Sequence, residues 1–345
     1  MKYKFYTTSQ KAWDGMFEAM AAAQQSIFIE MYIFADDTQI THDFLGLLKD
    51  KARAGLEVVI IADAYGSASL RNSAVDELRS AGAEFIFFSH WLRHTHRKIL
   101  IVDNAVAFIG GVNIEEKIRH WRDLQIRLQG RIVRPLLKSF AYTYEMAGGK
   151  KENILQYRRL PLIKKIKSWI TDNLTDADKT YHLSGYYRKK IIAAQTSILI
   201  VTPYLLPPRW LIALLDDACR RGVKVEVLIP RDTDVKPLNK INYWNACRLA
   251  DYGAEIYLMP SMNHAKIMLI DQEEGVIGSQ NIDILSFRLN VEAGVFFRQK
   301  DLVNDLQHLV TEWKKEATLL TSTPDKIKWF DKILIRILKI FYPIF

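Results

Sequence analysis

Apolar residues in this chain form short uninterrupted runs that alternate with amphipathic stretches. The runs with the length of buried strands are 26–34, 56–62, 197–205 and 223–230. Between them, 43–54 and 209–221 carry apolar residues at helical spacing and are followed by Gly55 and Gly222, and glycine commonly ends a helix. Strands that alternate with helices predict an α/β fold in which helices cover both faces of mixed or parallel sheets.

The two halves of the chain repeat the same segments in the same order. The sequence LLKDKARAGLEVVIIA from Leu47 is echoed by LLDDACRRGVKVEVLIP from Leu214, and HRKILIVD from His96 is echoed by HAKIMLID from His264. Repeats at a nearly constant offset indicate an internal duplication. The domains that we expect are a first half at 1–150, a basic linker at 151–180, a second half at 181–320 and a C-terminal tail at 321–345.

Each half contains the pattern H-x-K-x4-D on an apolar stretch. The two sets are His96, Lys98 and Asp103 in the first half and His264, Lys266 and Asp271 in the second. On a strand, residues i and i+2 point to the same side, so histidine and lysine project together from each strand. The carboxylates come where the strands end, and we expect Asp103 and Asp271 to support the hairpin turns rather than to donate protons.

Small residues and an asparagine follow each pattern at the same distance. They are Gly110, Gly111 and Asn113 in the first half and Gly278, Ser279 and Asn281 in the second. One such match has little weight, because a histidine and a lysine on a strand are usually an exposed edge or a satisfied core pair. Two matches with the same downstream pattern indicate shared chemistry.

These residues resemble the signature of the phospholipase D superfamily, which includes phospholipases, bacterial cardiolipin synthases, phosphatidylserine synthases and some nucleases. The resemblance covers residues 10–320 and implies a duplicated fold with two α/β halves, related by a pseudo-two-fold axis, around one active site. It implies that one histidine attacks phosphorus while the other protonates the leaving alcohol. It further implies that the groups holding the phosphoryl oxygens are Lys98, Lys266, Asn113, Asn281 and Ser279.

Elementary chemistry agrees with these roles. A phosphodiester is anionic, so lysines and amides must offset the charge on its oxygens, and no metal or other cofactor is then required. Imidazole, with an ordinary pKa of about 6.5, can act as a neutral nucleophile or as a protonated acid. A phosphohistidine intermediate lets an alcohol replace water as the acceptor. The repeat does not distinguish the two histidines, but resemblance to the bacterial enzymes favours His96 as nucleophile and His264 as acid and then base.

Three further residues are candidates for the site. A nucleophilic histidine needs a carboxylate on its other ring nitrogen, and the family places an acidic residue near the positions of Asp123, downstream of His96, and Glu292, downstream of His264. The alternative is that each is a surface charge beside a strand. His94 faces the same side as His96 and is either a substrate contact or a polar residue at the rim.

The segment GSQNIDILSFRLNVEA from Gly278 resembles cardiolipin synthases, although Leu285 replaces their common arginine. This implies a phosphatidyl transferase that joins two phosphatidylglycerols into cardiolipin and glycerol. The alternatives are a phospholipase D that forms phosphatidic acid, a nuclease or phosphodiesterase of the same family, and a non-catalytic membrane-binding protein on the same scaffold, which two intact motifs disfavour.

Charge and apolar patterning suggest where the protein acts. Lys and Arg number 48 against 39 Asp and Glu, a net charge of +9 that favours nucleic acid or anionic lipid as partner. Residues 325–345 have the pattern of a basic amphipathic helix, suited either to an anionic membrane surface or to packing on the core. No apolar run reaches about 18 residues and no signal peptide is evident. We therefore expect a cytoplasmic protein that associates peripherally with the cytoplasmic face of the cell membrane.

Overall fold

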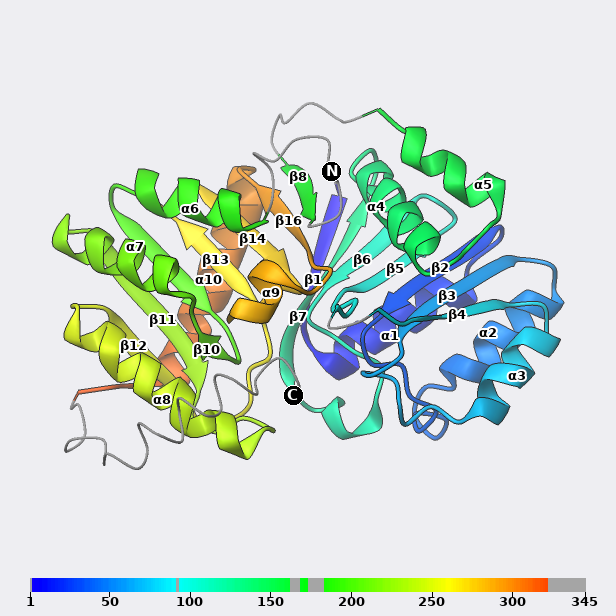
Figure 1. Cartoon of the computed structure of the whole chain (residues 1–345), viewed down its shortest axis with the longest axis horizontal. Coiled ribbons are helices and arrows are strands. Elements are labelled where there is room, and N and C mark those ends of the chain that lie inside the picture. The colour runs from blue at the N-terminus through cyan, green and yellow to red at the C-terminus, as the bar shows by residue number, and fades with distance from the viewer. Residues whose placement is uncertain (1, 91–92, 162–167, 173–182, 322–345) are drawn as a thin grey trace. The chain divides into compact units, whose positions relative to one another are not determined.

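The computed structural model describes the chain except residues 1, 91–92, 162–167, 173–182 and 322–345 (Figure 1). The chain forms two compact units, and each is described by itself. The first comprises 1–182 with two short segments from later in the chain, 277–279 and 290–296. The second comprises the rest, beginning at Leu183. The basic residues Lys164, Lys165 and Lys167 and the amphipathic tail lie outside the described residues.

The first unit is built on a seven-stranded sheet with the order β1-β7-β6-β5-β2-β3-β4. Its strands are β1 (Lys2–Thr8), β2 (Ser26–Met31), β3 (Glu57–Asp63), β4 (Glu84–Phe88), β5 (Lys98–Val102), β6 (Val106–Gly110) and β7 (Arg122–Gln129). Strands β2, β3 and β4 are parallel, and β5 runs antiparallel to β2. The helices are α1 (Ser9–Ala21), α2 (Phe44–Arg53), α3 (Asn72–Ser80), α4 (Val133–Met146) and α5 (Glu152–Leu155).

Helices cover both faces of this sheet (Figure 1), so the inner strand β2 is buried on both sides. Ile27 and Ile29 of β2 belong to the core that α1, α2 and α3 share with the sheet. Phe28 points the other way and stacks on Phe140 of α4, with ring centroids 5.3 Å apart. Every residue of β2 is buried, as in strands with two covered faces.

The second unit repeats this order of elements. Parallel strands β9 (Ser197–Val201), β11 (Lys224–Pro230) and β12 (Glu255–Met259) lie side by side, and β13 (Ile267–Ile270) runs antiparallel to β9. These strands belong to an eight-stranded sheet with the order β17-β12-β11-β9-β13-β14-β16-β8. The other strands are β8 (Ser168–Asp172), β14 (Glu274–Gly278), β16 (Ala293–Phe297), β17 (Thr318–Leu319) and the separate parallel pair β10 (Leu205–Leu206) and β15 (Ile282–Asp283). Of these, β8 and most of β16 fall in the residue ranges that belong to the first unit. The helices are α6 (Leu183–Ala193), α7 (Arg209–Arg220), α8 (Lys236–Asp251), α9 (Ile284–Arg288) and α10 (Lys300–Glu316).

The predicted elements and the fold class are confirmed. The two expected helices are observed as α2 and α7, and the glycines after them, Gly55 and Gly222, have φ angles of 88° and 81°. Glycine adopts this left-handed backbone without strain, so it ends both helices in the same way. In each half a parallel three-stranded core is followed by an antiparallel hairpin, β5–β6 or β13–β14. The pseudo-two-fold relation of the halves stays a prediction.

The expected linker has structure of its own. Helix α5, the 3-10 turn Gln156–Arg159 and strand β8 all lie within it. Arg158 forms an ion pair with Glu145, and Arg159 lies 3.3 Å from a carboxylate oxygen of Glu152. These two arginines are therefore partly neutralised.

None of the helices in the described ranges combines the length and the apolar character that crossing a bilayer needs.

Candidate active site

His96 is held by a carboxylate from far along the chain. Its Nδ1 lies 2.9 Å from Oε1 of Glu292, whose side chain is fully buried, while the His96 side chain keeps 10% of its surface exposed. The His96 backbone N–H donates to the Val291 carbonyl, and the Val291 N–H donates to the His94 carbonyl. This short ladder keeps Glu292 beside the histidine. All of these residues belong to the first compact unit.

The pair fits a nucleophile. A carboxylate accepts hydrogen bonds only, so the proton of neutral His96 sits on Nδ1 and leaves a lone pair on Nε2. Sequence spacing associates Glu292 with His264, the histidine of its own motif, but in the structure it contacts His96. Spacing along the chain cannot reveal this exchange, because segment 290–296 packs with the first unit although it follows the second motif.

Ser279 supports Glu292. Its hydroxyl donates to the second carboxylate oxygen, Oε2, and accepts a hydrogen bond of 3.2 Å from the Ala293 N–H. The sequence predicts a phosphate contact for Ser279, and that role stays a prediction. What the structure shows is a hydrogen-bonded chain from Ser279 through Glu292 to His96.

Asp123 occupies the corresponding place in the first half, where Gly111 lies beside it at the position that Ser279 has in the second half. It is fully buried, and its Oδ1 accepts a 2.7 Å hydrogen bond from the Leu124 N–H. A Cβ atom at Gly111 would lie only 2.1 Å from this oxygen. Glycine therefore makes room for the carboxylate in one half, whereas serine binds the longer glutamate in the other. The role of Asp123 in orienting a histidine stays a prediction.

The two lysines of the motifs adopt the same arrangement. Lys98 Nζ donates to the carbonyl oxygen of His96 at 2.6 Å, and Lys266 Nζ donates to that of His264 at 2.5 Å. Lys98 is fully buried and Lys266 is 2% exposed. An ammonium group is costly to bury, so two such lysines beside histidines provide fixed positive charge for an anion.

The asparagines contribute amide groups at the ends of strands. Asn113 accepts a hydrogen bond of 3.2 Å from the Ile33 N–H through Oδ1, so its side chain is fixed. Asn281 is also buried, and within the part of the chain that the structure describes its Oδ1 has no hydrogen-bond partner. Rotation of the Asn281 amide by about 180° exchanges its oxygen and its NH2 group, so either can occupy this position. A phosphoryl oxygen only accepts hydrogen bonds, so the Asn281 group suited to bind it is the NH2 and not the unpaired Oδ1.

His264 lies in the second unit, 5% exposed, with its ring 6.4 Å from that of Tyr204. The structure thus groups His96, Lys98, Asn113, Glu292 and Ser279 in one unit, and His264, Lys266 and Asn281 in the other. That the two imidazoles meet at one phosphorus atom stays a prediction.

Asp103 and Asp271 tie the hairpins to the first strand of each parallel core. Asp103 accepts backbone N–H bonds from Gln24, Gln25 and Ser26, and Asp271 accepts the same set from Gln195, Thr196 and Ser197. The φ angles of Asp103 and Asp271, 50° and 52°, are left-handed values that aspartate tolerates better than most residues. These contacts are those of structural supports.

The backbone donors also set the pKa of Asp103. Burial raises the pKa, but the N–H groups of Ser26, Gln24 and Gln25 outweigh it and leave the pKa below its ordinary value. The unfolded carboxyl has a pKa of about 3.9, so the folded state gains stability above that pH and loses it as pH falls through the lower folded pKa.

We therefore expect Asp103→Asn to destabilise the protein by about 1 kcal/mol at pH 7, because charge-assisted hydrogen bonds become neutral ones. The difference from wild type should shrink below about pH 4, where the wild-type carboxyl is protonated as well. Urea unfolding at several pH values measures it. Asp50→Asn is the control, since Asp50 is 75% exposed. A difference between Asp103→Asn and wild type that is constant with pH would contradict this role.

Tyr32 is a site residue that the sequence does not reveal by its chemistry. Its ring lies 4.8 Å from that of His96, and Lys98 Nζ lies 5.0 Å from its centroid. Burial, followed by the charge of Asp63, raises its pKa, so the phenol stays protonated. The available signal was position: Tyr32 directly follows β2, and ligands of parallel sheets bind at the carboxyl ends of strands.

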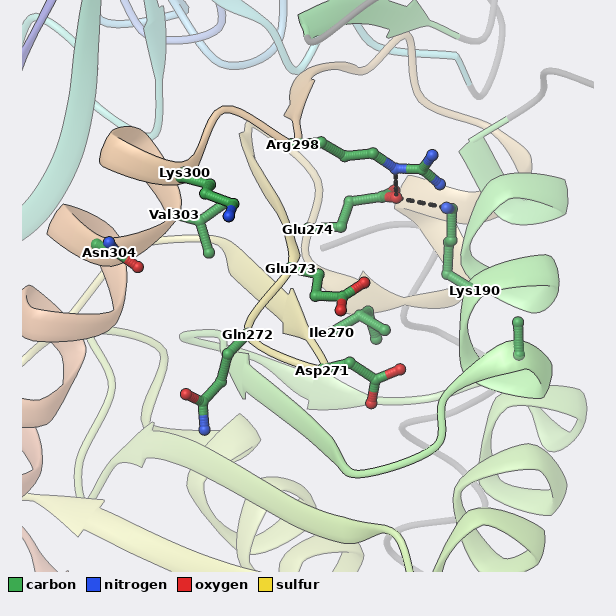
Figure 2. A pocket seen from close by; sticks show the side chains of 11 residues that line it. Lys190, Ile270, Asp271, Gln272, Glu273, Glu274, Arg298, Lys300, Val303 and Asn304 are labelled. Carbon is green, nitrogen blue, oxygen red and sulfur yellow. Dashed lines mark hydrogen bonds and ion pairs between the residues drawn. The ribbon is translucent and has the colours of Figure 1, made fainter.

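A separate polar pocket of about 750 Å³ lies in the second unit (Figure 2). In it, Glu274 binds both Lys190 and Arg298, the latter at 2.5 Å, and Asp271 forms part of the wall. Asp271 follows β13 whereas His264 precedes it, so the pocket and the histidine are at opposite ends of that strand. The pocket is therefore not the candidate active site.

Known proteins resemble this chain over almost its whole length. The family model described as "Cardiolipin synthase, PLD-like domain" matches residues 16–140 and 187–313, one match for each motif. Cardiolipin synthase 1 of Staphylococcus epidermidis is 30% identical over 93% of this chain and 69% of its own. The cardiolipin synthase of Clostridium perfringens is 30% identical over 92% of this chain and 71% of its own.

The fold is also found in a solved structure. Phosphatidylserine synthase of Haemophilus influenzae Rd KW20 superposes with a TM-score of 0.76 over 99% of this chain and 93% of its own, at 14% identity. That likeness shows the duplicated α/β fold. The family match over both motifs and the relatives at 30% identity establish that this chain belongs to the phospholipase D-like cardiolipin synthase family of phosphatidyltransferases.

Proposed function

We propose that the protein joins two phosphatidylglycerol molecules into cardiolipin and releases glycerol. The observation that carries the proposal is the His96–Glu292 pair, with Nδ1 and Oε1 2.9 Å apart. It leaves Nε2 as a nucleophile and provides a negative charge for the imidazolium that forms when this nitrogen bonds to phosphorus. The relatives named cardiolipin synthase support the choice of lipid.

The proposed reaction has two displacements. First, His96 Nε2 forms a bond to phosphorus, the bond from phosphorus to the glycerol oxygen breaks, and His264 gives a proton to the leaving glycerol. Second, a hydroxyl of another phosphatidylglycerol attacks phosphorus, His264 takes its proton, and the P–N bond breaks with its electron pair returning to His96. Lys98, Lys266 and the two asparagines offset the charge on the phosphoryl oxygens.

We also propose that the protein works at the surface of an anionic membrane without spanning it. The net charge of +9 supports this, because each basic residue near an anionic surface contributes about 1 kcal/mol of attraction. We propose the cytoplasmic face of the cell membrane as the location and phosphatidylglycerol as the anionic lipid.

The test is incubation of purified protein with vesicles of phosphatidylglycerol and phosphatidylethanolamine in the presence of a chelator, with lipid products identified by mass spectrometry. We expect cardiolipin and free glycerol from wild type and neither from His96→Asn. Phosphatidic acid without cardiolipin would make the protein a hydrolase. Unchanged lipids together with cleavage of added DNA would make it a nuclease and overturn the proposal.

A further inference from the structure

A second histidine–carboxylate pair lies next to His96. Asp63 is the last residue of β3, and its Oδ1 lies 3.1 Å from Nδ1 of His94. The same oxygen accepts the N–H groups of Tyr65 and Gly66, and Oδ2 accepts that of Thr95 at 2.9 Å. Asp63 is fully buried, so its carboxylate is a rigid anchor for the ring of His94.

His94 keeps a free polar edge toward solvent. Its side chain is 28% exposed, and among the residues that the structure describes its Nε2 has no hydrogen-bond partner. Because the Asp63 carboxylate can only accept, the ring proton of neutral His94 lies on Nδ1, and Nε2 is an acceptor. The ring of Tyr65, which is 55% exposed, lies 5.3 Å from that of His94.

Tyr32 links this pair to the nucleophile. Its ring centroid lies 6.4 Å from that of His94 and 4.8 Å from that of His96. A Cβ at Gly66 would come within 2.8 Å of the Tyr32 ring, so this glycine lets the turn after β3 lie against the tyrosine. The Tyr32 ring therefore lies close to both His94, whose Nε2 is the acceptor, and His96, the proposed nucleophile. All three lie near the carboxyl ends of β2 and β3.

The pair occurs in one half only. The sequence repeat places Pro230 and Met262 where the first half has Asp63 and His94. The groups proposed to bind the phosphoryl oxygens, in contrast, are lysine and asparagine in both halves. Recognition of the alcohol on one side of phosphorus needs such a difference between the halves, since identical halves would treat the two sides alike.

We propose that His94, held by Asp63, determines specificity for the alcohol by accepting a hydrogen bond from a free hydroxyl of the glycerol headgroup. The inference rests on the proposed function and specifies that His94 and Asp63 recognise the glycerol headgroup of the substrate. The hydroxyl is one that does not react, so His94 neither bonds to phosphorus nor transfers the proton. Leaving and entering glycerol pass through the same position, and His94 contacts both.

The test measures the choice between two acceptors in one tube. Wild-type protein with phosphatidylglycerol vesicles receives equal amounts of deuterated glycerol and 1-propanol, and mass spectrometry gives the ratio of labelled phosphatidylglycerol to phosphatidylpropanol. One lost hydrogen bond to a neutral hydroxyl corresponds to about a tenfold change. We therefore expect the ratio to fall about tenfold in His94→Ala and to recover partly in His94→Gln, whose amide can still bind a hydroxyl.

The control is His42→Gln. His42 also pairs with an aspartate among aromatic rings, at 2.9 Å from Asp14, and its variant should keep the wild-type ratio. An unchanged ratio in His94→Ala, with or without slower exchange of both alcohols, would overturn the inference. Should His94→Ala form no product, the ratio in His94→Gln decides in the same way. Absence of any exchange by wild type would overturn the proposed function instead.

Discussion

His96→Asn should reduce cardiolipin formation to background, and His264→Asn should reduce it by about 10²–10⁴-fold, the usual worth of a general acid and base. His96 supplies the nucleophile, for which asparagine is no substitute, whereas His264 supplies protons that water can replace slowly. The assay is cardiolipin formed per enzyme from phosphatidylglycerol vesicles. His308→Asn is the control, because His308 is exposed on α10.

This result also separates one active site from two. If each motif formed a site of its own, either single variant would keep about half of the wild-type rate. Such an outcome would contradict the assignment of different roles to the two histidines, even if the double variant were inactive.

Glu292→Gln should lower kcat by about 10²-fold or more and leave the KM for lipid nearly unchanged. The amide has the shape of the carboxylate but no charge, so it neither fixes the His96 tautomer nor stabilises the imidazolium. Glu292 touches His96 and Ser279 rather than substrate, which is why binding should survive. Steady-state kinetics on mixed vesicles measures both constants.

A purely structural role for Glu292 would give a different pattern. In that case the melting temperature would fall while kcat, per folded molecule, stayed within about twofold of wild type. Glu255→Gln serves as the matched control, since Glu255 lies on β12, is 40% exposed and pairs with Lys224.

Local pattern was sufficient to predict the framework of this fold. Strand β2 and helix α2 follow from an apolar run and a helical period that end where left-handed glycine becomes necessary, as at Gly55. The same signals recur in the second half and mark the corresponding elements there, β9 and α7. The turn after β5 was also predictable, because Asp103 and Asn104 tolerate positive φ angles of 50° and 55°.

The site was predictable only as a set of residues. The histidine that Glu292 contacts depends on the path of segment 290–296. Glu292 lies 196 residues from His96 in sequence, so the sequence alone does not reveal this contact. Asp63 was not recognised because a single aspartate at the end of a strand has no motif, and it meets His94 only through the turn that follows β3. Leu285, which replaces a common arginine, packs against Leu206, Leu238 and Ile241, so an apolar cluster occupies that position.

The most direct test of the account is to trap the covalent intermediate. Wild-type protein mixed with phosphatidylglycerol is quenched rapidly in cold denaturant at mildly basic pH, which preserves the P–N bond without hydrolysing the acyl esters, and its peptides are mapped by mass spectrometry. We expect a phosphatidyl adduct on the peptide that contains His96 and no adduct in His96→Asn. An adduct on the peptide that contains His264, or full turnover with no adduct on either histidine, would contradict it.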